Sequence, residues 1–146
     1  MKRDEPTDFA RLMASECLAV RVRRLGRVIT RVYDAALAPH GITIAQLNLL
    51  TAIVAADGAR LTDLGRILDV EKSTLSRDLQ RMELLGWIRF VPRQSSRGRT
   101  ISLTPAGTRL FLEVRPAWEK AQETARSQLG RRAFARLRNL LQPIGP

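Results

Sequence analysis

Residues 62–103 decide the fold, and they read TDLGRILDVEKSTLSRDLQRMELLGWIRFVPRQSSRGRTISL. Two segments, 62–68 and 72–85, have apolar side chains at helical spacing. Beyond them the hydrophobic period becomes two, which predicts short strands over 87–91 and 100–103. A short helix, a second helix and a hairpin in this order predict a helix-turn-helix followed by a wing. The helix pair and the hairpin together are a specific signal for this fold, whereas either one alone would be a weak signal.

The second of these helices has two unlike faces. Leu75, Leu79 and Met82 fall on one face, at spacings of four and three. Plain surface helices are usually filled with Glu and Lys, but the other face here carries hydroxyl, guanidinium and amide groups. Its residues are Ser73, Thr74, Ser76, Arg77, Gln80 and Arg81. Such a face predicts a recognition helix, because an α-helix fits the major groove of duplex DNA, about 12 Å wide.

A long helical pattern precedes this unit, from about Phe9 to Ala38. Its apolar residues recur at spacings of four and three and form one stripe: Leu18, Val22, Leu25, Ile29, Val32 and Ala36. The opposite face is basic, with Arg21, Arg24, Arg27 and Arg31. The stripe predicts either core packing or a seam to another subunit.

Further helices are predicted on both sides of the recognition unit. Thr43 fits the N-cap of a helix that runs to about Ala56. Thr104-Pro105 opens another helix, predicted to continue to about Leu129, and a last helix follows it. The predicted fold class is mainly α with a small β-wing. It is one domain over 1–146, with a winged helix-turn-helix at 43–104 between terminal helices at 9–40 and 105–142.

The charge of the chain favours a polyanionic partner. There are 25 Lys and Arg against 14 Asp and Glu, giving a formal net charge of +11. A basic surface gains free energy by releasing counterions condensed around phosphates. Only Lys2, Lys72 and Lys120 are lysines, so a general bias toward arginine is the alternative explanation. A sequence-indifferent nucleic-acid coating protein would use the same charge.

The residues needed for catalysis are scarce. His40 is the only histidine and Cys17 the only cysteine, which removes most acid–base relays, multi-histidine metal sites and internal disulfides. No phosphate loop or nucleophile elbow is present. We therefore expect no enzyme activity, no cofactor and no metal. An uninterrupted apolar stretch of the ~18 residues that a membrane helix needs is also missing, so we expect a cytoplasmic protein without a membrane partner.

Over about residues 15–142 the sequence resembles the MarR family of winged helix-turn-helix transcription regulators. The resemblance rests on the following motifs: Tyr33-Asp34-Ala35-Ala36-Leu37, Gly41-Ile42-Thr43 with Gln46, Lys72-Ser73-Thr74-Leu75-Ser76-Arg77, Leu84-Leu85-Gly86-Trp87-Ile88, Arg97-Gly98-Arg99 and Leu103-Thr104-Pro105-Ala106-Gly107. It implies a homodimer in which the terminal helices at 9–40 and 105–142 intertwine. It also implies a pseudo-palindromic operator in double-stranded DNA, a repressor role, and a small-molecule effector bound between the dimerisation helices and the winged region.

The resemblance implies DNA contacts for Ser73, Thr74, Ser76, Arg77 and Arg97, and the position and chemistry of neighbouring residues add further candidates. Those predicted are Thr62, Lys72, Ser73, Thr74, Ser76, Arg77, Gln80, Arg81, Arg93, Arg97 and Arg99. Arg97 matches the wing arginine of the family and Thr62 suits a phosphate contact. The family commonly has Asp two residues before that arginine, and here the position is Ser95. The wing arginine is therefore expected to be held more loosely or by another group.

Three further residues are weaker candidates. Tyr33 and Trp118 are candidate effector contacts, although aromatic side chains at these positions fit packing or a dimer core equally. A peroxide-sensing branch of the family uses one cysteine in its first helix. Cys17 lies about two residues earlier than that position, roughly 200° around the helix. Redox sensing therefore stays an alternative to a cysteine that packs as a small hydrophobe.

Overall fold

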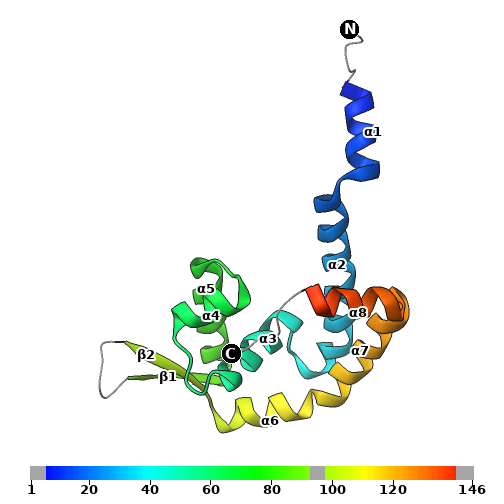
Figure 1. Ribbon diagram of the computed structural model, residues 1–146. Helices are drawn as coiled ribbons and strands as arrows, with labels where there is room; N and C mark the ends of the chain where they lie inside the picture. The colour runs from blue at the N-terminus through cyan, green and yellow to red at the C-terminus, as the bar shows by residue number, and fades with distance from the viewer. Residues whose placement is uncertain (1–5, 93–97, 141–146) are drawn as a thin grey trace.

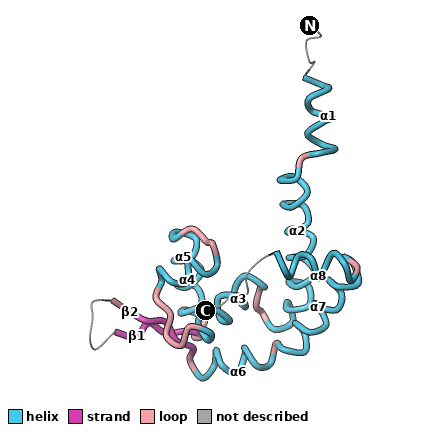
Figure 2. Tube along the Cα trace, in the orientation of Figure 1, coloured by secondary structure: helices cyan, strands magenta, loops and turns pink. Residues whose placement is uncertain are grey.

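The computed structural model describes residues 6–92 and 98–140 (Figure 1). Its elements in chain order are α1 (Pro6–Glu16), α2 (Leu18–Leu37), the short 3₁₀ helix η1 (Ala38–His40), α3 (Ile44–Ala55), α4 (Leu61–Leu68), α5 (Lys72–Leu84), β1 (Ile88–Pro92), β2 (Arg99–Leu103), α6 (Pro105–Glu113), α7 (Arg115–Leu129) and α8 (Arg131–Leu140). The predicted class, mainly α with a small two-stranded wing, is confirmed. Figure 2 shows the hairpin and α1 projecting from different parts of the molecule.

Helix α3 is the centre of the winged region. It begins as predicted at Thr43, whose hydroxyl accepts a hydrogen bond from the Gln46 amide while the Gln46 side chain accepts one from the Thr43 amide. This capping box satisfies two of the amides that a helix start leaves without a partner. The carboxylate of Asp34 accepts a third amide, that of Ile44, at 2.7 Å. Five α3 side chains are buried: Leu47, Leu49, Leu50, Ala52 and Ile53.

The wing is an antiparallel hairpin attached to this core. Ile88 pairs with Leu103 and Pro92 with Arg99 at the two ends of the register. Ile88 and Ile101 point into the core, with 2% and 1% of their surfaces exposed. Ala59 forms an additional bridge to Ile101, which ties the segment before α4 to the base of the wing. The turn that precedes α4 and the wing are therefore fixed to each other.

The single N-terminal helix predicted from Phe9 to Ala38 is wrong. The backbone leaves the helix at Cys17, with φ −64° and ψ 113°, and α1 and α2 are separate helices. A helix end leaves carbonyl groups without partners, and here the Arg21 guanidinium donates to the carbonyl of Ser15. No glycine or proline marks this break. The periodicity continued through it because both helices are amphipathic.

The single helix predicted from Pro105 to Leu129 is also wrong. It divides at Val114 into α6 and α7, and Pro116 occupies the first turn of α7. Proline has no amide hydrogen to donate and its ring clashes with the carbonyl four residues back, so a helix cannot run through it undisturbed. The N-cap at Thr104 is as predicted, with its hydroxyl accepting from the Gly107 amide at 3.0 Å.

Gly107 sets the junction between the wing and the terminal helices. A Cβ atom added at Gly107 would lie 1.9 Å from the carbonyl oxygen of Trp87. Thr104 closes the same contact, since its amide donates to the Trp87 carbonyl at 2.9 Å. Only glycine permits this approach of α6 to the Trp87 carbonyl, just before β1.

Candidate nucleic-acid interface

Helix α5 presents the predicted polar face to solvent. Leu75, Leu79 and Met82 are almost completely buried, at 1%, 0% and 0% exposure. The opposite face is exposed along its whole length, and its residues are Ser73, Thr74, Arg77, Gln80 and Arg81, with Lys72 at its start. Ser76 lies at the edge of this face and is half-buried. The anchored apolar side fixes the rotation of the helix, and therefore fixes which groups point outward.

The turn before α5 orients its N-terminus. Asp69 adopts a left-handed conformation, with φ 51° and ψ 47°, and the Val70 amide donates to the Gly65 carbonyl at 3.1 Å. The N-cap residue of α5, Glu71, makes no side-chain hydrogen bond to the helix. The first amides of α5 therefore receive no side-chain cap from Glu71, and the hydroxyls of Ser73 and Thr74 are exposed in the same turn, an arrangement that suits phosphate oxygens.

Arg77 lies at the middle of the exposed face. Its Nε donates to the Ser73 carbonyl at 3.4 Å, which is a long bond at an exposed position. Because that bond is weak, the guanidinium can exchange it for the two acceptors on a guanine edge at little cost.

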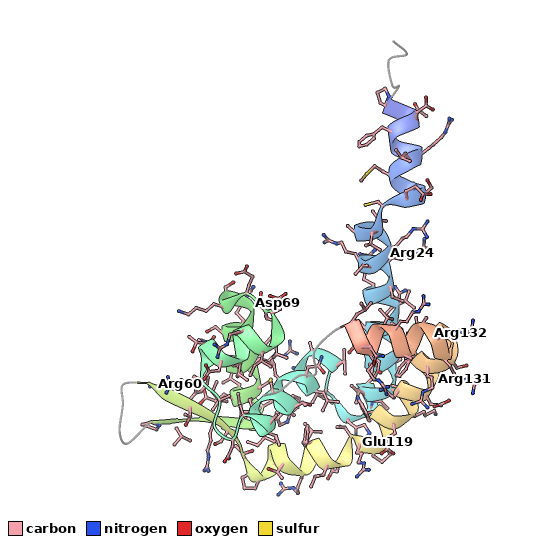
Figure 3. All side chains as sticks on the ribbon, viewed as in Figure 1. Arg24, Arg60, Asp69, Glu119, Arg131 and Arg132 are labelled. Atoms are coloured by element: carbon pink, nitrogen blue, oxygen red, sulfur yellow. The ribbon has the colours of Figure 1, made fainter. Side chains whose placement is uncertain are left out.

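Helix α4 adds a second helix start next to α5. Thr62 is exposed in its first turn, as predicted, and the N-cap residue Arg60 makes no side-chain cap. Arg60 was missed by sequence reasoning. It is exposed, it precedes α4 directly, and it lies beside the wing (Figure 3). The signal was its position just before Thr62, where a cation and a helix start can hold the same phosphate.

A hollow joins α5 to the wing. It is lined by Leu61, Ser76, Leu79, Gln80, Glu83, Phe90, Arg99 and Ile101. Three predicted residues, Ser76, Gln80 and Arg99, therefore come together on one surface. Glu83 was not predicted here, and it lines the same hollow as Arg99. The predicted wing residues Arg93 and Arg97 lie outside the described residues, as does Ser95.

The strands of the wing carry one more cation that was missed. Arg89 is exposed on β1, and its Nε donates to the Ser102 hydroxyl of β2 at 3.3 Å. This cross-strand bond holds the guanidinium against the hairpin.

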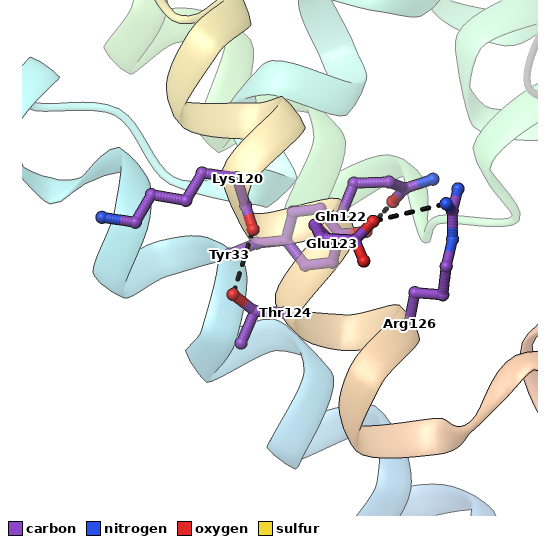
Figure 4. A network of polar contacts seen from close by, with 6 residues as sticks. All are labelled: Tyr33, Lys120, Gln122, Glu123, Thr124 and Arg126. Carbon is purple, nitrogen blue, oxygen red and sulfur yellow. Dashed lines mark hydrogen bonds and ion pairs between the residues drawn. The ribbon is translucent and has the colours of Figure 1, made fainter.

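The two aromatic residues predicted as effector contacts, Tyr33 and Trp118, have different surroundings. The Tyr33 hydroxyl donates to the Gln122 side chain between α2 and α7, in the network of Figure 4. Burial raises the pKa of Tyr33, so its hydroxyl stays protonated. Trp118 is 38% exposed on α7. A groove between α2 and α7 lies nearby, but its lining includes neither aromatic residue: Val32, Ala35, Ala36, Pro39, Ala117, Lys120, Ala121 and Thr124.

Cys17 lies at the junction of α1 and α2, half-buried. The guanidinium of Arg21, one turn further on, is bonded to the Ser15 carbonyl. Arg21 is the cation that the sequence offers for activating the Cys17 thiol. In the structure its guanidinium is bonded to a backbone carbonyl.

Within residues 6–92 and 98–140, no cluster of three His, Cys, Asp or Glu side chains could hold a metal ion. No single helix in these ranges is long and apolar enough to cross a membrane. The bent pair Leu18–His40 and Ile44–Ala55, at 81° to each other, has sufficient length and composition, but its second member contributes five side chains to the core.

Comparison with known proteins adds independent findings. Residues 40–98 match the model of the MarR family. The multiple antibiotic resistance protein MarR of Salmonella typhimurium is 31% identical over 132 residues, which cover 84% of this chain and 91% of that protein. The Mycobacterium tuberculosis transcriptional regulator MosR, solved in complex with DNA, is 30% identical with a TM-score of 0.72, over 84% of this chain and 93% of MosR.

A third similarity concerns the fold alone. A structure of Bordetella bronchiseptica BpsR, described in connection with regulation of its DNA binding by 6-hydroxynicotinic acid, has a TM-score of 0.77 at 19% identity, covering 86% of this chain and 91% of that one. The identity to Salmonella MarR and its coverage carry the assignment. The chain belongs to the MarR family of winged-helix transcription regulators.

Proposed function

We propose that this protein binds double-stranded DNA in a sequence-dependent manner by placing α5 in the major groove. The observation that carries the proposal is the outward face of α5, on which Ser73, Arg77 and Gln80 are exposed while its other side is locked into the core. Arg and Gln can each bond a base edge bidentately, and the hydroxyls can bond bases or phosphates. The complex of MosR with DNA supports this use of the fold.

The groups around α5 complete the interface. Thr62 and Arg60 bind a phosphate at the start of α4, and Lys72, Thr74, Ser76 and Arg81 contact the backbone beside the groove. We assign the wing arginines Arg93, Arg97 and Arg99 to contacts with the adjacent minor groove, where narrow A·T tracts concentrate negative potential. Phosphate contacts set the register and the α5 side chains supply sequence preference.

We propose that the working form is a homodimer built from the terminal helices at 9–40 and 105–142. An apolar stripe of α1 and α2 is exposed in the single chain: Phe9, Leu12, Met13, Leu18 and Val22. Exposed apolar surface of this extent at one end of a chain marks an interaction site. A two-fold dimer would present two α5 helices to a pseudo-palindromic site with half-site centres about 34–36 Å apart.

In this role the protein is a repressor that a signal releases from DNA. The regulation of BpsR by 6-hydroxynicotinic acid supports a small-molecule signal on this fold. We assign the chain no catalytic activity and place it in the cytoplasm with the DNA it regulates. An effector lodged between the terminal helices and the winged region would change the spacing of the two α5 helices, and so their fit to the operator.

Selection of duplexes from a random-sequence library at moderate salt tests the proposal. An inverted repeat with half-sites one helical turn apart is the expected result. Enrichment of nothing beyond base composition, with affinity falling steeply as salt rises, would instead favour the rival hypothesis of a sequence-indifferent coating protein.

Substituting Arg77 with Ala tests the orientation of α5. We expect a loss of about 1–3 kcal/mol of binding free energy, confined to one position in each half-site. Arg66→Ala is the matched control, because Arg66 is exposed on α4 but already paired with Asp63 at 3.3 Å. Equal losses on every sequence, or none, would show that Arg77 does not read a base.

A further inference from the structure

The positive charge of this chain lies mainly outside the winged region. Residues 43–104 hold nine Lys and Arg against six Asp and Glu, a net charge of only +3 out of +11. The excess is concentrated on two terminal helices: α2 has Arg21, Arg23, Arg24, Arg27 and Arg31, and α8 has Arg131, Arg132, Arg136 and Arg138. A helix-turn-helix alone does not account for this distribution.

These arginines lack the acidic neighbours that other helices supply. Arg115 pairs with Glu119 and Arg126 with Glu123 on α7. The ion pairs of the described residues include none from α2 or α8. The single acidic residue of α2, Asp34, is bonded to the Ile44 amide. The field of the α2 and α8 guanidinium groups is therefore not neutralised by acids on the same helices.

The arginines of α2 form a row on one side of the helix. Arg23, Arg27 and Arg31 are exposed, and they line a shallow hollow with Gly26 and Thr30. At 1.5 Å per residue the row spans about 12 Å. Duplex DNA carries one phosphate per ~1.7 Å of its axis, so about seven phosphates lie within that length. A row of this length suits a linear polyanion better than one small anion.

Arginines of both basic helices lie on the side of the molecule away from the wing. In Figure 3, Arg24, Arg131 and Arg132 point to the side of the molecule opposite Arg60 and the hairpin. Helix α8 packs on α7, and α7 packs on α2, so the two basic helices belong to one layered unit. A straight duplex seated on α5 would not reach this side. Any DNA bound there would belong to a second segment.

We propose that the arginines of α2 and α8 form a second, sequence-independent binding surface for duplex DNA, which allows one molecule to hold two duplex segments. The bridging of two segments rests on the proposed function of α5; the binding of one duplex by the second surface does not. Contacts to phosphates from guanidinium groups require no particular base sequence. The second surface raises the affinity for any DNA near the operator.

The test uses the chain of residues 1–146 with its α5 helices saturated by the selected operator duplex carrying a donor dye. A duplex of unrelated sequence carrying an acceptor dye is then added, and energy transfer reports bridging. We expect transfer with the unaltered protein and its loss in the triple variant R23Q/R27Q/R31Q. Operator affinity should stay within about two-fold, because the winged region is unchanged.

A matched control removes the same charge elsewhere. The triple variant R11Q/R109Q/R115Q changes three exposed arginines on α1, α6 and α7, and we expect it to retain bridging. The charge-conserving variant R23K/R27K/R31K should also retain it. For unrelated duplex, R23Q/R27Q/R31Q should lower the slope of log affinity against log salt by about three relative to that control.

Other outcomes would overturn the proposal. Equal bridging and equal salt slopes in R23Q/R27Q/R31Q and its control would show that the α2 arginines do not bind DNA. Dissociation of the homodimer in R23Q/R27Q/R31Q would assign this face to the subunit interface. Binding of anionic phospholipid vesicles but of no second duplex would assign it to a membrane surface. The slope for unrelated duplex still tests the second surface if the selection finds no operator, so the two proposals fail separately.

Discussion

The winged region and the terminal helices differ in how much of their apolar surface is buried within the single chain. Among the described residues, twelve of the seventeen buried core residues lie within 43–104, around α3, and nine of the thirteen partly buried hydrophobic residues packed against the core cluster come from the same segment. Helices α1 and α8 contain no buried residue, and Phe9, Leu12 and Leu18 are 61%, 57% and 72% exposed. The winged region buries its apolar side chains within one chain, whereas the terminal helices leave apolar side chains exposed that a second subunit can cover.

Because of this difference, we expect the stability of the fold to depend on the winged region and self-association to depend on the terminal helices. Changes to buried side chains of the winged region should lower the free energy of unfolding. Changes to the apolar stripe of α1 should leave the single chain folded and weaken self-association. Variants in each region test that separation, and the largest effect is expected at α1.

The first prediction concerns the exposed stripe of α1. Replacing Phe9 and Leu12 with Asp should weaken self-association by about 3–6 kcal/mol, since burying each side chain contributes about 1.5–3 kcal/mol. Sedimentation velocity over a range of concentrations measures the change. The double variant T7D/A14D adds the same charge to the opposite face of α1 and should remain dimeric. Equal dissociation of both variants would show that charge, rather than the apolar face, is responsible.

The second prediction concerns the core of the winged region. Leu79 is 0% exposed on α5, and Leu79→Ala should lower the free energy of unfolding by about 2–5 kcal/mol because it leaves a cavity. Leu84 ends the same helix at 89% exposure, and Leu84→Ala should change stability by less than about 0.5 kcal/mol. Urea denaturation of both variants gives the comparison. Similar losses in the two would mean that Leu84 is covered in the dimer.

The third prediction concerns the junction of the two regions. Gly107→Ala would place a methyl group against the Trp87 carbonyl, and overpacking of this kind costs about 1–3 kcal/mol. Because α6 must then shift from the wing, DNA affinity should fall with stability. A Cβ added at Gly26, inside α2, would meet no atom within 4 Å, so Gly26→Ala should stabilise by about 0.5–1 kcal/mol. Thermal unfolding and operator binding of both variants check these opposite signs.

Sequence reasoning predicted the winged region well because its signals are local. The Thr43 and Thr104 caps, the turn at Asp69 and the change of hydrophobic period all depend on near neighbours. The terminal helices were predicted less well. Pro116 indicates the break at Val114, but the hydrophobic periodicity on both sides of it favoured one continuous helix. The break at Cys17 carries no such signal, and the bond from Arg21 to the Ser15 carbonyl beside it is not encoded in the hydrophobic pattern.

The candidate interface divides in the same way. The exposure of Ser73, Arg77 and Gln80 followed from helical periodicity once Leu75, Leu79 and Met82 were taken as core. Arg60 and Glu83 were missed because their position depends on how α4 and the wing pack against α5, which spacing along the chain does not encode. The hydrogen bond between Tyr33 and Gln122 joins residues 89 positions apart and was equally out of reach.

The hydrogen bond from Tyr33 to Gln122 joins α2 to α7, and both residues lie outside the winged region. Removing the Tyr33 hydroxyl should cost about 1 kcal/mol, a typical net value for one hydrogen bond. Tyr33→Phe should therefore lower the stability of the terminal helices slightly and leave DNA affinity of the folded dimer unchanged. Urea denaturation at neutral pH measures the first effect, and loss of operator affinity at a concentration that keeps the dimer intact would contradict the second.

The same hydroxyl gives a pH dependence whose sign is fixed by its burial. The pKa of Tyr33 is raised in the folded protein above the value of about 10 expected in the unfolded chain. Below that value both states are protonated and nothing is lost; as pH rises past it, the unfolded chain ionises first and the folded state loses stability. Tyr33 is the only tyrosine, so tyrosinate absorbance reports this group alone. The loss of stability above pH ~10 should shrink in Tyr33→Phe, and a tyrosinate titration at or below the unfolded value would rule out desolvation of the hydroxyl between α2 and α7.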